Sequence, residues 1–395
     1  MPLQTSRTLF LAGFLYILSS CVSNGEPKPK LAMESFPKFG KVNISYNDTT
    51  DPKFKEMIYQ LDTFYQRQIS LGFNGSVLVG YKGKILYKRY FGIADRENNI
   101  LWDEQTQSQL ASTSKPFTAG AILILKDKGL LGIDDPVNKY ISYFPYPEIT
   151  LRMLLNHRSG LPDYLKLMTK AADKPYLCND DVLSWLAVKR PKLNFTSDTK
   201  FTYCNTNYVV LASVIEKVTG MKFDYFMKRF LFTPLGMTNT FVVDPNDIKN
   251  EHTANSYNYR WKLEPNMHFD GVWGDKGVYS TVEDLYRWDQ ALYSGKLIKS
   301  STLSEAYRGY SFEKEGVKNY GLGWRMLDYP NGTKIIYHNG WWHGNNTSFY
   351  RFIDDNFTII VLGNRFNKNI YRQPQQIYNI INGQMVNGEE IETEE

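Results

Sequence analysis

The sequence has 395 residues, of which 42% are hydrophobic and 15% aromatic. This composition excludes a disordered chain and allows one large catalytic unit with an inserted subdomain. The 46 basic and 41 acidic residues are spread along the chain without the basic stripe of a nucleic-acid-binding protein, so we expect no nucleic-acid partner.

The first twenty residues differ from the rest. Leu9–Leu18 is an apolar run that is too short to span a bilayer as a helix, and it predicts a signal peptide over residues 1–20. Ser19, Ser20 and Cys21 follow this run directly and resemble the lipobox of bacterial lipoproteins. The resemblance implies that Cys21 is lipidated and anchors the protein to a membrane of the bacterial cell envelope, in the periplasm or at the surface. An ordinary cleaved signal with an unmodified cysteine is the alternative.

Residues 21–50 are polar and contain Pro and Gly, so they predict a tether between the lipid and a domain over residues 51–385. Residues 386–395 predict a solvated acidic tail. Besides Cys21, only Cys178 and Cys204 remain. They form either one disulfide or two buried thiols, and their spacing does not distinguish the two.

The first predicted elements of the domain come from hydrophobic periodicity. Apolar residues at helical spacing predict a helix over Phe54–Ser70, and two β-rich runs, Ser76–Val79 and Ile85–Tyr90, predict a hairpin. Ala111 then leads into a helical run that ends near Lys128, with Gly129 as its C-cap.

Residues from about 134 to 270 have mostly helical patterns, and strand character returns afterwards. Lys334–Tyr337, Thr347–Phe352 and Phe357–Leu362 predict strands, and a final helix opens near Pro374. Strands near both ends of the domain predict an α+β fold. Its antiparallel sheet comes from the N- and C-terminal parts, is flanked by helices and carries an inserted, mostly helical subdomain. A cleft between the two parts is the expected site.

Ser-x-x-Lys is the first motif that can place a nucleophile beside a base, and it occurs four times in the sequence. Only one copy stands at the start of an apolar helix, where the two side chains can meet. The copies begin at Ser35, Ser112, Ser197 and Ser311. Only Ser112 opens an apolar helical run, where spacing i, i+3 brings Lys115 to the same face and the helix N-terminus stabilises negative charge. The alternative is a helix-capping serine with a surface lysine.

Two further short motifs offer polar groups. Tyr203-Cys204-Asn205 lies in a polar loop, where a phenol and an amide two residues apart point the same way. His338-Asn339-Gly340 ends a strand and precedes Trp341-Trp342, and a strand edge offers N–H groups to an oxyanion. Taken singly, the first is better explained as an ordinary packing tyrosine and the second as a loop histidine.

Together the three motifs, in this order and spacing, resemble the serine β-lactamase and penicillin-binding-protein superfamily. The resemblance is to the branch of class C β-lactamases, DD-peptidases and related esterases, and it runs from about residue 55 to 382. Four more stretches look similar to that family, namely Phe73–Val79, Leu155–Leu161, Pro234–Met237 and Gly274–Gly277.

The resemblance implies a β-lactamase/transpeptidase-like fold and a role for each matched residue. Ser112 is then the acylated nucleophile, and Lys115 and Tyr203 pass its proton to the leaving group. Asn205, His338 and Gly340 would bind the substrate, and the backbone N–H groups of Ser112 and Trp341 would form the oxyanion hole. We predict no metal and no cofactor.

His338 stands where class C β-lactamases carry the Lys of Lys-Thr-Gly, and a His at this position more closely resembles DD-peptidases and D-amino-acid hydrolases. We therefore expect a D-alanyl-D-alanine carboxypeptidase-like hydrolase that acts on small or peptidoglycan-like peptide, amide or ester substrates. An esterase and a weak class C-type β-lactamase are the enzyme alternatives. A penicillin-binding sensor and an inactive scaffold are the non-enzyme alternatives, and the oligomeric state is left open.

Overall fold

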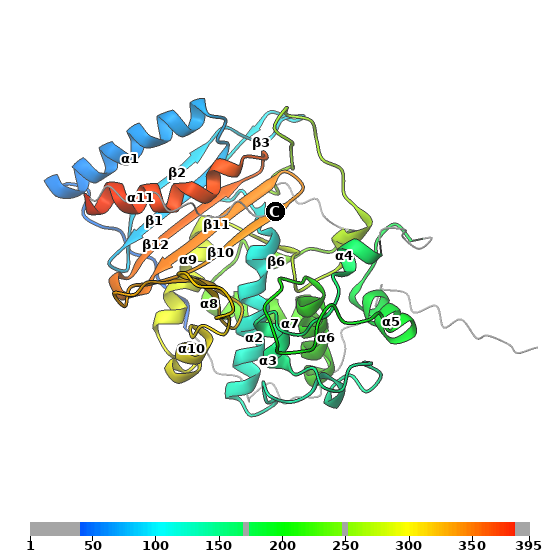
Figure 1. Ribbon diagram of the computed structural model, residues 1–395. Coiled ribbons are helices and arrows are strands. Elements are labelled where there is room, and N and C mark those ends of the chain that lie inside the picture. The colour runs from blue at the N-terminus through cyan, green and yellow to red at the C-terminus, as the bar shows by residue number, and fades with distance from the viewer. Residues whose placement is uncertain (1–39, 169–173, 247–251, 384–395) are drawn as a thin grey trace, which may run out of the picture.

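The computed structural model describes residues 40–168, 174–246 and 252–383 (Figure 1). The predicted signal peptide, Cys21, the first part of the predicted tether and the acidic tail lie outside the described residues. Within the described ranges, no helix combines the length and the hydropathy needed to cross a bilayer.

The centre of the fold is a seven-stranded antiparallel sheet with the strand order β2-β1-β12-β11-β10-β9-β8. Its strands are β1 (Gly75–Tyr81), β2 (Lys84–Phe91), β8 (Lys318–Tyr320), β9 (Arg325–Asp328), β10 (Lys334–Trp342), β11 (Asn345–Phe352) and β12 (Phe357–Gly363). Five shorter strands form two small sheets, namely β3 (Ile93–Asp95), β4 (Ile100–Leu101), β5 (Ser108–Gln109), β6 (Phe241–Val242) and β7 (Val278–Ser280).

The helices divide between the flanks of this sheet and the region inserted between its strands. They are α1 (Pro52–Ser70), α2 (Lys115–Asp127), α3 (Leu151–Leu155), α4 (Tyr164–Leu167), α5 (Asn179–Lys189), α6 (Thr206–Thr219), α7 (Phe223–Met227), α8 (Thr233–Leu235), α9 (Val282–Tyr293), α10 (Ser300–Ala306) and α11 (Gln373–Asn382). α3 to α8 lie between residues 134 and 270, where the sequence predicts a mostly helical insertion.

The pairing of β1 with β12 joins the two ends of the domain, with Gly75 opposite Gly363 and Tyr81 opposite Phe357. Both strands are buried along nearly their whole length, which explains their continuous apolar runs. This pairing confirms the predicted α+β fold with a sheet built from the N- and C-terminal parts.

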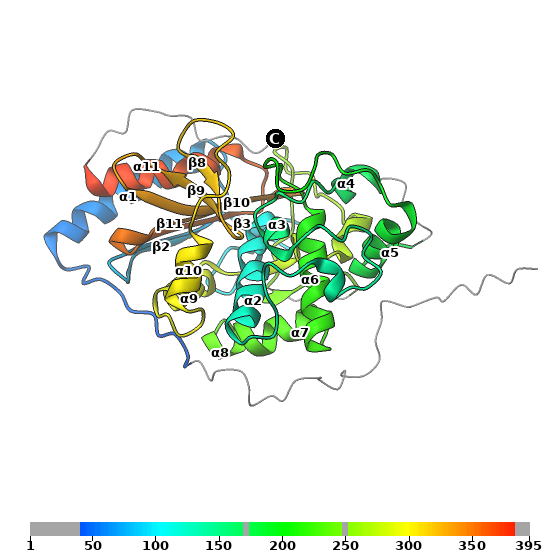
Figure 2. The ribbon, with the colours of Figure 1, turned by 60° about the horizontal axis from the view of Figure 1, so that its bottom comes forward.

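Helices cover both faces of the sheet (Figures 1 and 2). α1 and α11 pack together on one face, and their apolar sides share a core with β1, β2 and β12. α2, α6 and α9 share the larger core on the other face. Every residue of α2 from Lys115 to Leu125 is buried, so this helix is enclosed by the core on all sides up to its last two residues.

Two boundaries differ from the sequence prediction. Residues 40–50 are not a free tether, because Val42 donates to the carbonyl of Leu235 and the backbone of 45–47 pairs with Ile85 on β2. β10 does not end at Tyr337 but continues to Trp342, so His338-Asn339-Gly340 lies within a strand. Pairing with β11 over the whole length of β10 outweighs the turn preference of Asn-Gly.

Candidate active site

Ser112 lies in a 3-10 turn, Ala111–Ser114, that leads directly into α2. The preceding residue, Ala111, has a φ of +51°, a left-handed conformation that is costly for a residue with a side chain. The turn is held from both sides, because Leu110 donates to the carbonyl of Val278 and accepts from the Thr347 hydroxyl. The strained turn presents the Ser112 side chain at the mouth of a buried helix.

Lys115 is completely buried, and its Nζ atom contacts three oxygen atoms. Nζ lies 2.9 Å from Ser112 Oγ, 2.8 Å from Asn205 Oδ1 and 3.0 Å from the backbone carbonyl of Asp275. Asn205 Oδ1 and the Asp275 carbonyl can only accept and therefore take two N–H groups of Lys115, whereas the Ser112 hydroxyl can also donate to Nζ. The structure therefore brings together the predicted Ser112, Lys115 and Asn205.

Asn205 is oriented by Asp163, a residue that the sequence does not mark. One carboxylate oxygen of Asp163 accepts from the backbone N–H of Asn205 at 3.0 Å and from its side-chain amide at 2.9 Å. The amide oxygen of Asn205 is thereby turned to Lys115. The only local signal at Asp163 is its place after Pro162 as the N-cap of α4, since its other oxygen accepts from Leu165.

Tyr203 lines the cleft and stands between two cations. Lys115 Nζ lies 4.8 Å from the centre of the Tyr203 ring, and the guanidinium carbon of Arg325 lies 5.0 Å from it. Such contacts attract a cation to the face of an aromatic ring. Arg325 belongs to β9, over 100 residues away in sequence, and no local pattern connects it with Tyr203.

Cys204, between Tyr203 and Asn205, points away from the cleft as expected. Its thiol is free and buried, and it donates to the carbonyl of Leu161. Burial raises the pKa of this thiol to about 12. A free Cys204 excludes the disulfide between Cys178 and Cys204.

His338 lies beneath the cleft rather than on its surface. The side chain is 0% exposed, and its Nε2 atom is 3.2 Å from the Tyr320 hydroxyl. Its Nδ1 atom donates to the backbone carbonyl of Asn339, which fixes the tautomer. A direct contact between His338 and a substrate therefore requires a change in this buried arrangement.

The Tyr320 hydroxyl joins His338 to a second buried histidine, His157. Nδ1 of His157 accepts from the backbone N–H of Cys204, so its Nε2 carries the proton and donates to Tyr320, 3.2 Å away. Burial first, and then the positive charges of Lys115 and Arg325, lower the pKa of each histidine well below the usual value. The pair is consequently uncharged at neutral pH.

Gly340 lets β10 approach the Ser112 turn. A Cβ atom at this position would lie 2.3 Å from the Leu110 carbonyl and 3.0 Å from the backbone nitrogen of Ser112. β9 pairs with β10 only as far as Tyr337, so the following residues run beside the turn instead. Gly340 therefore brings this part of β10 close to the backbone of Ser112, and the next residue, Trp341, is 43% exposed.

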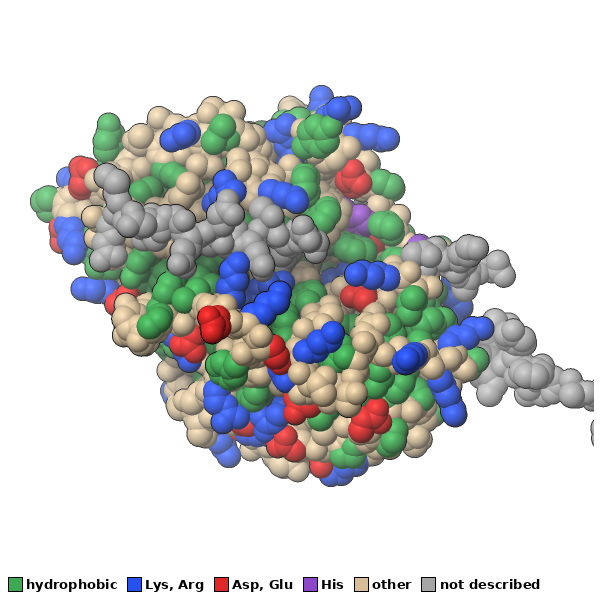
Figure 3. All heavy atoms as spheres, in the orientation of Figure 1, with side chains coloured by type: hydrophobic (Ala, Val, Ile, Leu, Met, Phe, Trp, Pro, Cys, Tyr) green, Lys and Arg blue, Asp and Glu red, His purple; other side chains and the backbone are tan. Residues whose placement is uncertain are grey.

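These residues open onto a cleft of about 1110 Å³. Its lining includes Ser112, Tyr203, Asn205, Asn339 and Trp341 of the predicted motifs. The further charged residues in its wall are Asp163, Lys166, Glu264, Asp275, Lys276, Lys318, Arg325 and Arg372. Basic side chains also lie along the boundary between the sheet and the helical region in the space-filling view (Figure 3).

Comparison with known proteins identifies the family. The Beta-lactamase family matches residues 71–379. Penicillin-binding protein 4* of Bacillus subtilis (strain 168) is 35% identical over 318 residues, which cover 76% of this chain and 70% of that protein.

Two solved structures show the same fold. A penicillin-binding protein from Bacillus halodurans superposes with a TM-score of 0.70 at 22% identity, over 81% of this chain and 97% of that one. A class C β-lactamase superposes with a TM-score of 0.69 at 20% identity, over 87% of this chain and 100% of that one. The chain therefore belongs to the Beta-lactamase family, the serine hydrolases that include penicillin-binding proteins and class C β-lactamases.

Proposed function

We propose that the protein is a serine hydrolase that forms an acyl-enzyme on Ser112 and acts on peptide, amide or ester substrates in the manner of a D-alanyl-D-alanine carboxypeptidase. The observation that carries the proposal is the 2.9 Å contact between Lys115 Nζ and Ser112 Oγ at the opening of the cleft. This distance is within the range required between a nucleophile and its general base.

In the proposed first step, a neutral Lys115 amine accepts the Ser112 proton while Ser112 Oγ attacks the substrate carbonyl carbon. The negative charge on the carbonyl oxygen is held by the backbone N–H groups of Ser112 and Trp341. Removal of one such donor typically costs about 3 kcal/mol of transition-state stabilisation. Tyr203 then passes the proton from Lys115 to the nitrogen or oxygen of the leaving group, which departs as an amine or alcohol.

In the second step, water attacks the acyl group on Ser112 and the acid is released. Lys115 and Tyr203 take a proton from this water as it attacks and return one to Ser112 Oγ as the acyl bond breaks, as microscopic reversibility requires. Asn205 offers an amide beside the reacting serine and would hold the amide of the acyl group. The fixed orientation of Asn205 by Asp163 supports this role.

The carboxylate of such a substrate needs a cation in the cleft. His338 is uncharged and buried, whereas Arg325 and Lys318 line the cleft on the side of Tyr203. We therefore assign the carboxylate of a peptide substrate to the Arg325 side of the cleft. This assignment takes the place of the one made from the sequence for His338.

Intact-protein mass spectrometry tests the proposal. The purified protein is incubated with benzylpenicillin and, separately, with a chromogenic acetyl ester. Ser112→Ala is compared with Ser197→Ala, which removes the serine of another Ser-x-x-Lys motif. We expect a penicilloyl adduct and ester turnover that are both lost in Ser112→Ala and retained in Ser197→Ala. Equal behaviour of wild type and Ser112→Ala in both assays would disprove the assignment of the nucleophile.

The same assays separate the remaining alternatives. Rapid release of penicilloic acid without a stable adduct indicates a β-lactamase. Ester turnover without any reaction with penicillin indicates an esterase. A stable adduct together with no turnover of any ester or D-alanyl peptide indicates a sensor, and a folded protein that never acylates indicates a scaffold.

We also propose that the protein is a lipoprotein of the bacterial cell envelope, anchored at Cys21. The support is the apolar run followed by small residues and a cysteine at the start of the sequence. Cys21→Ala tests this by membrane fractionation and mass spectrometry of the N-terminus. An unmodified wild-type Cys21 would overturn the proposal.

A further inference from the structure

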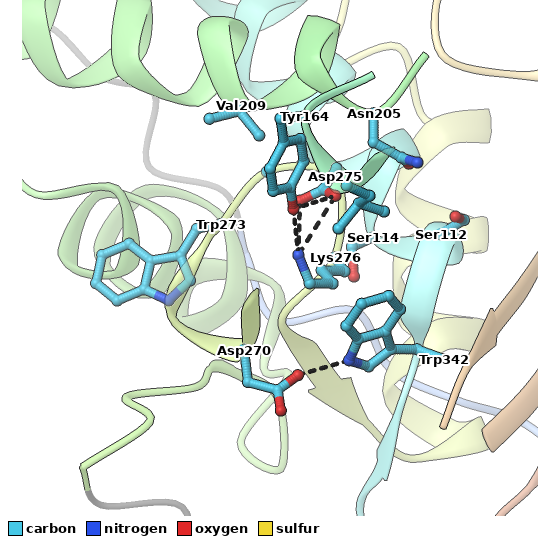
Figure 4. Close-up of polar contacts among 12 residues, drawn as sticks. Ser112, Ser114, Tyr164, Asn205, Val209, Asp270, Trp273, Asp275, Lys276 and Trp342 are labelled. Atoms are coloured by element: carbon cyan, nitrogen blue, oxygen red, sulfur yellow. Dashed lines mark hydrogen bonds and ion pairs between the residues drawn. The ribbon is translucent and has the colours of Figure 1, made fainter. Parts of the chain in front are cut away.

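A second lysine, Lys276, is built into the wall of the cleft (Figure 4). Only 3% of Lys276 is exposed. Its Nζ atom lies 5.2 Å from the centre of the Tyr164 ring and 4.9 Å from the centre of the Trp342 ring. The Trp342 ring, at the end of β10, therefore lies close to the ammonium group, whereas Tyr164 of α4 contacts it through its hydroxyl.

Hydrogen bonds close a triangle around this lysine. Lys276 Nζ donates to the Tyr164 hydroxyl at 2.5 Å and lies 3.4 Å from both carboxylate oxygens of Asp275. The Tyr164 hydroxyl in turn donates to Asp275 at 3.0 Å. Burial, followed by the charge of Asp275, raises the pKa of Tyr164 well above its usual value, so the phenol keeps its proton.

The triangle is connected to the reacting groups at two points. The backbone carbonyl of Asp275 is one of the three acceptors of Lys115. Trp342 is the residue next to Trp341 on β10, and its ring nitrogen donates to Asp270 at 2.5 Å. Lys276 thus links the loop that holds Lys115 to the strand beside Ser112.

The buried charges require this arrangement. Asp275 is 1% exposed, and an unpaired carboxylate at that depth would be strongly unfavourable. Lys276 supplies the opposite charge within the same wall. Without Lys276, the Asp275 carboxylate would keep an uncompensated negative charge. Because the backbone carbonyl of Asp275 contacts Lys115, this negative charge would lie near the Lys115 amine and would favour its protonated form.

We propose that Lys276 is a positioning residue for acylation, which fixes the Asp275 carbonyl against Lys115 and neutralises the Asp275 carboxylate beside it. The inference rests on the proposed acylation of Ser112. Lys276 borders the cleft but is 3% exposed and is held by Tyr164 and Asp275, so we expect its loss to lower the reaction rate more than the substrate affinity.

The test measures benzylpenicillin acylation of the full-length protein between pH 5.5 and 9.5, separating the limiting rate from the half-saturating concentration. In Lys276→Met we expect the limiting rate to fall at least about 10-fold, with a half-saturating concentration within about threefold of wild type. The acid limb of the pH–rate profile, where the rate falls because the Lys115 amine becomes protonated, should move to higher pH. Lys276→Arg keeps the charge and should restore the position of the acid limb.

Lys126→Met is the matched control, because Lys126 lies at the far end of α2 in an ion pair with Glu305. This variant should leave both the rate and the acid limb unchanged. If Lys276→Met does not fold, Tyr164→Phe removes only one hydroxyl of the triangle and should shift the acid limb in the same direction.

The outcomes separate this inference from the proposed function. If wild type does not acylate at Ser112, the proposed function itself fails. If wild type acylates normally and the variants change only the half-saturating concentration, or leave the rate and the acid limb in place, Lys276 is not a positioning residue.

Discussion

Asp163 accepts two hydrogen bonds from Asn205, one from the backbone N–H and one from the side-chain amide. The next residue, Tyr164, donates to Asp275. Asn205 and Asp275 in turn supply two of the three oxygen atoms around Lys115 Nζ. Asp163 and Tyr164, which are consecutive residues at the start of α4, therefore hold Asn205 and Asp275, the two residues that accept from Lys115 besides Ser112.

Asp163→Asn tests the first half of this arrangement. The substitution exchanges one acceptor oxygen for an amide donor, so either Asn205 or the N-terminus of α4 loses its partner. A hydrogen bond to a charged group contributes about 1.5–3 kcal/mol, so we expect acylation by benzylpenicillin to slow about 10- to 100-fold. Asp198→Asn, which alters an exposed carboxylate paired with Arg158, is the control. An acylation rate equal to that of wild type would contradict the role of Asp163.

Gly340→Ala tests the close approach of β10 to the Ser112 turn. The new methyl group would lie 2.3 Å from the Leu110 carbonyl and 2.5 Å from the Thr347 hydroxyl, so the strand must move away. We expect a loss of about 1–3 kcal/mol of stability in urea unfolding and a slower acylation of Ser112. Gly40→Ala, where a Cβ atom meets nothing within 4 Å, should change neither quantity.

Arg325→Met tests the assignment of the substrate carboxylate. Two ester substrates are compared that differ only in a free carboxylate. We expect kcat/KM to fall about 10- to 100-fold for the carboxylate-bearing ester and to change little for the neutral one. If kcat/KM for the carboxylate-bearing ester falls more in His338→Gln than in Arg325→Met, His338 and not Arg325 binds the substrate carboxylate.

The buried pair His157 and His338 predicts that acid destabilises the fold. Both pKa values are depressed, so the unfolded chain binds more protons than the native protein below about pH 6.5. Stability is then fully present above that pH and falls as the pH decreases toward the folded pKa values. Each histidine contributes at most about 1.4 kcal/mol per pH unit.

Urea unfolding at pH 7.5 and 5.5 measures this effect. His338→Gln should have a smaller loss of stability between the two pH values than wild type has. His252→Gln, which changes a histidine outside the pair, should retain the full loss. A wild-type protein that is equally stable at both pH values would contradict the prediction.

The sequence predicts well those elements whose apolar residues repeat regularly. Six elements lie within a few residues of their predicted ranges, namely α1, the β1–β2 hairpin, α2, β11, β12 and α11. Each of them buries either one regularly spaced apolar face or a continuous apolar segment, and both patterns can be read from the sequence. β8 and β9 have three and four residues and no clear alternation, and they were not predicted. They exist as strands because β10 offers an edge to pair with.

The same distinction applies to the site. Ser112 and Lys115 are neighbours on one helical turn, so local spacing suffices to bring them together. Asp163, Asp275 and Arg325 come from separate loops and strands, and only the packed fold brings them to Asn205, Lys115 and Tyr203, respectively. Lys276 lies in the family-like stretch Gly274–Gly277, but its contact with Tyr164 spans 112 residues and is a property of the tertiary structure.

The pairing of β1 with β12 also determines how late the candidate active site is completed during synthesis. Residues 75–81 leave the ribosome almost 300 residues before their partners at 357–363, and the inner edge of the β1–β2 hairpin stays open during that time. β10, the strand that completes the surroundings of Ser112, also emerges late. A nascent chain therefore carries Ser112 in an incomplete site until β10 and β12 have emerged, long after α2 itself has been synthesised.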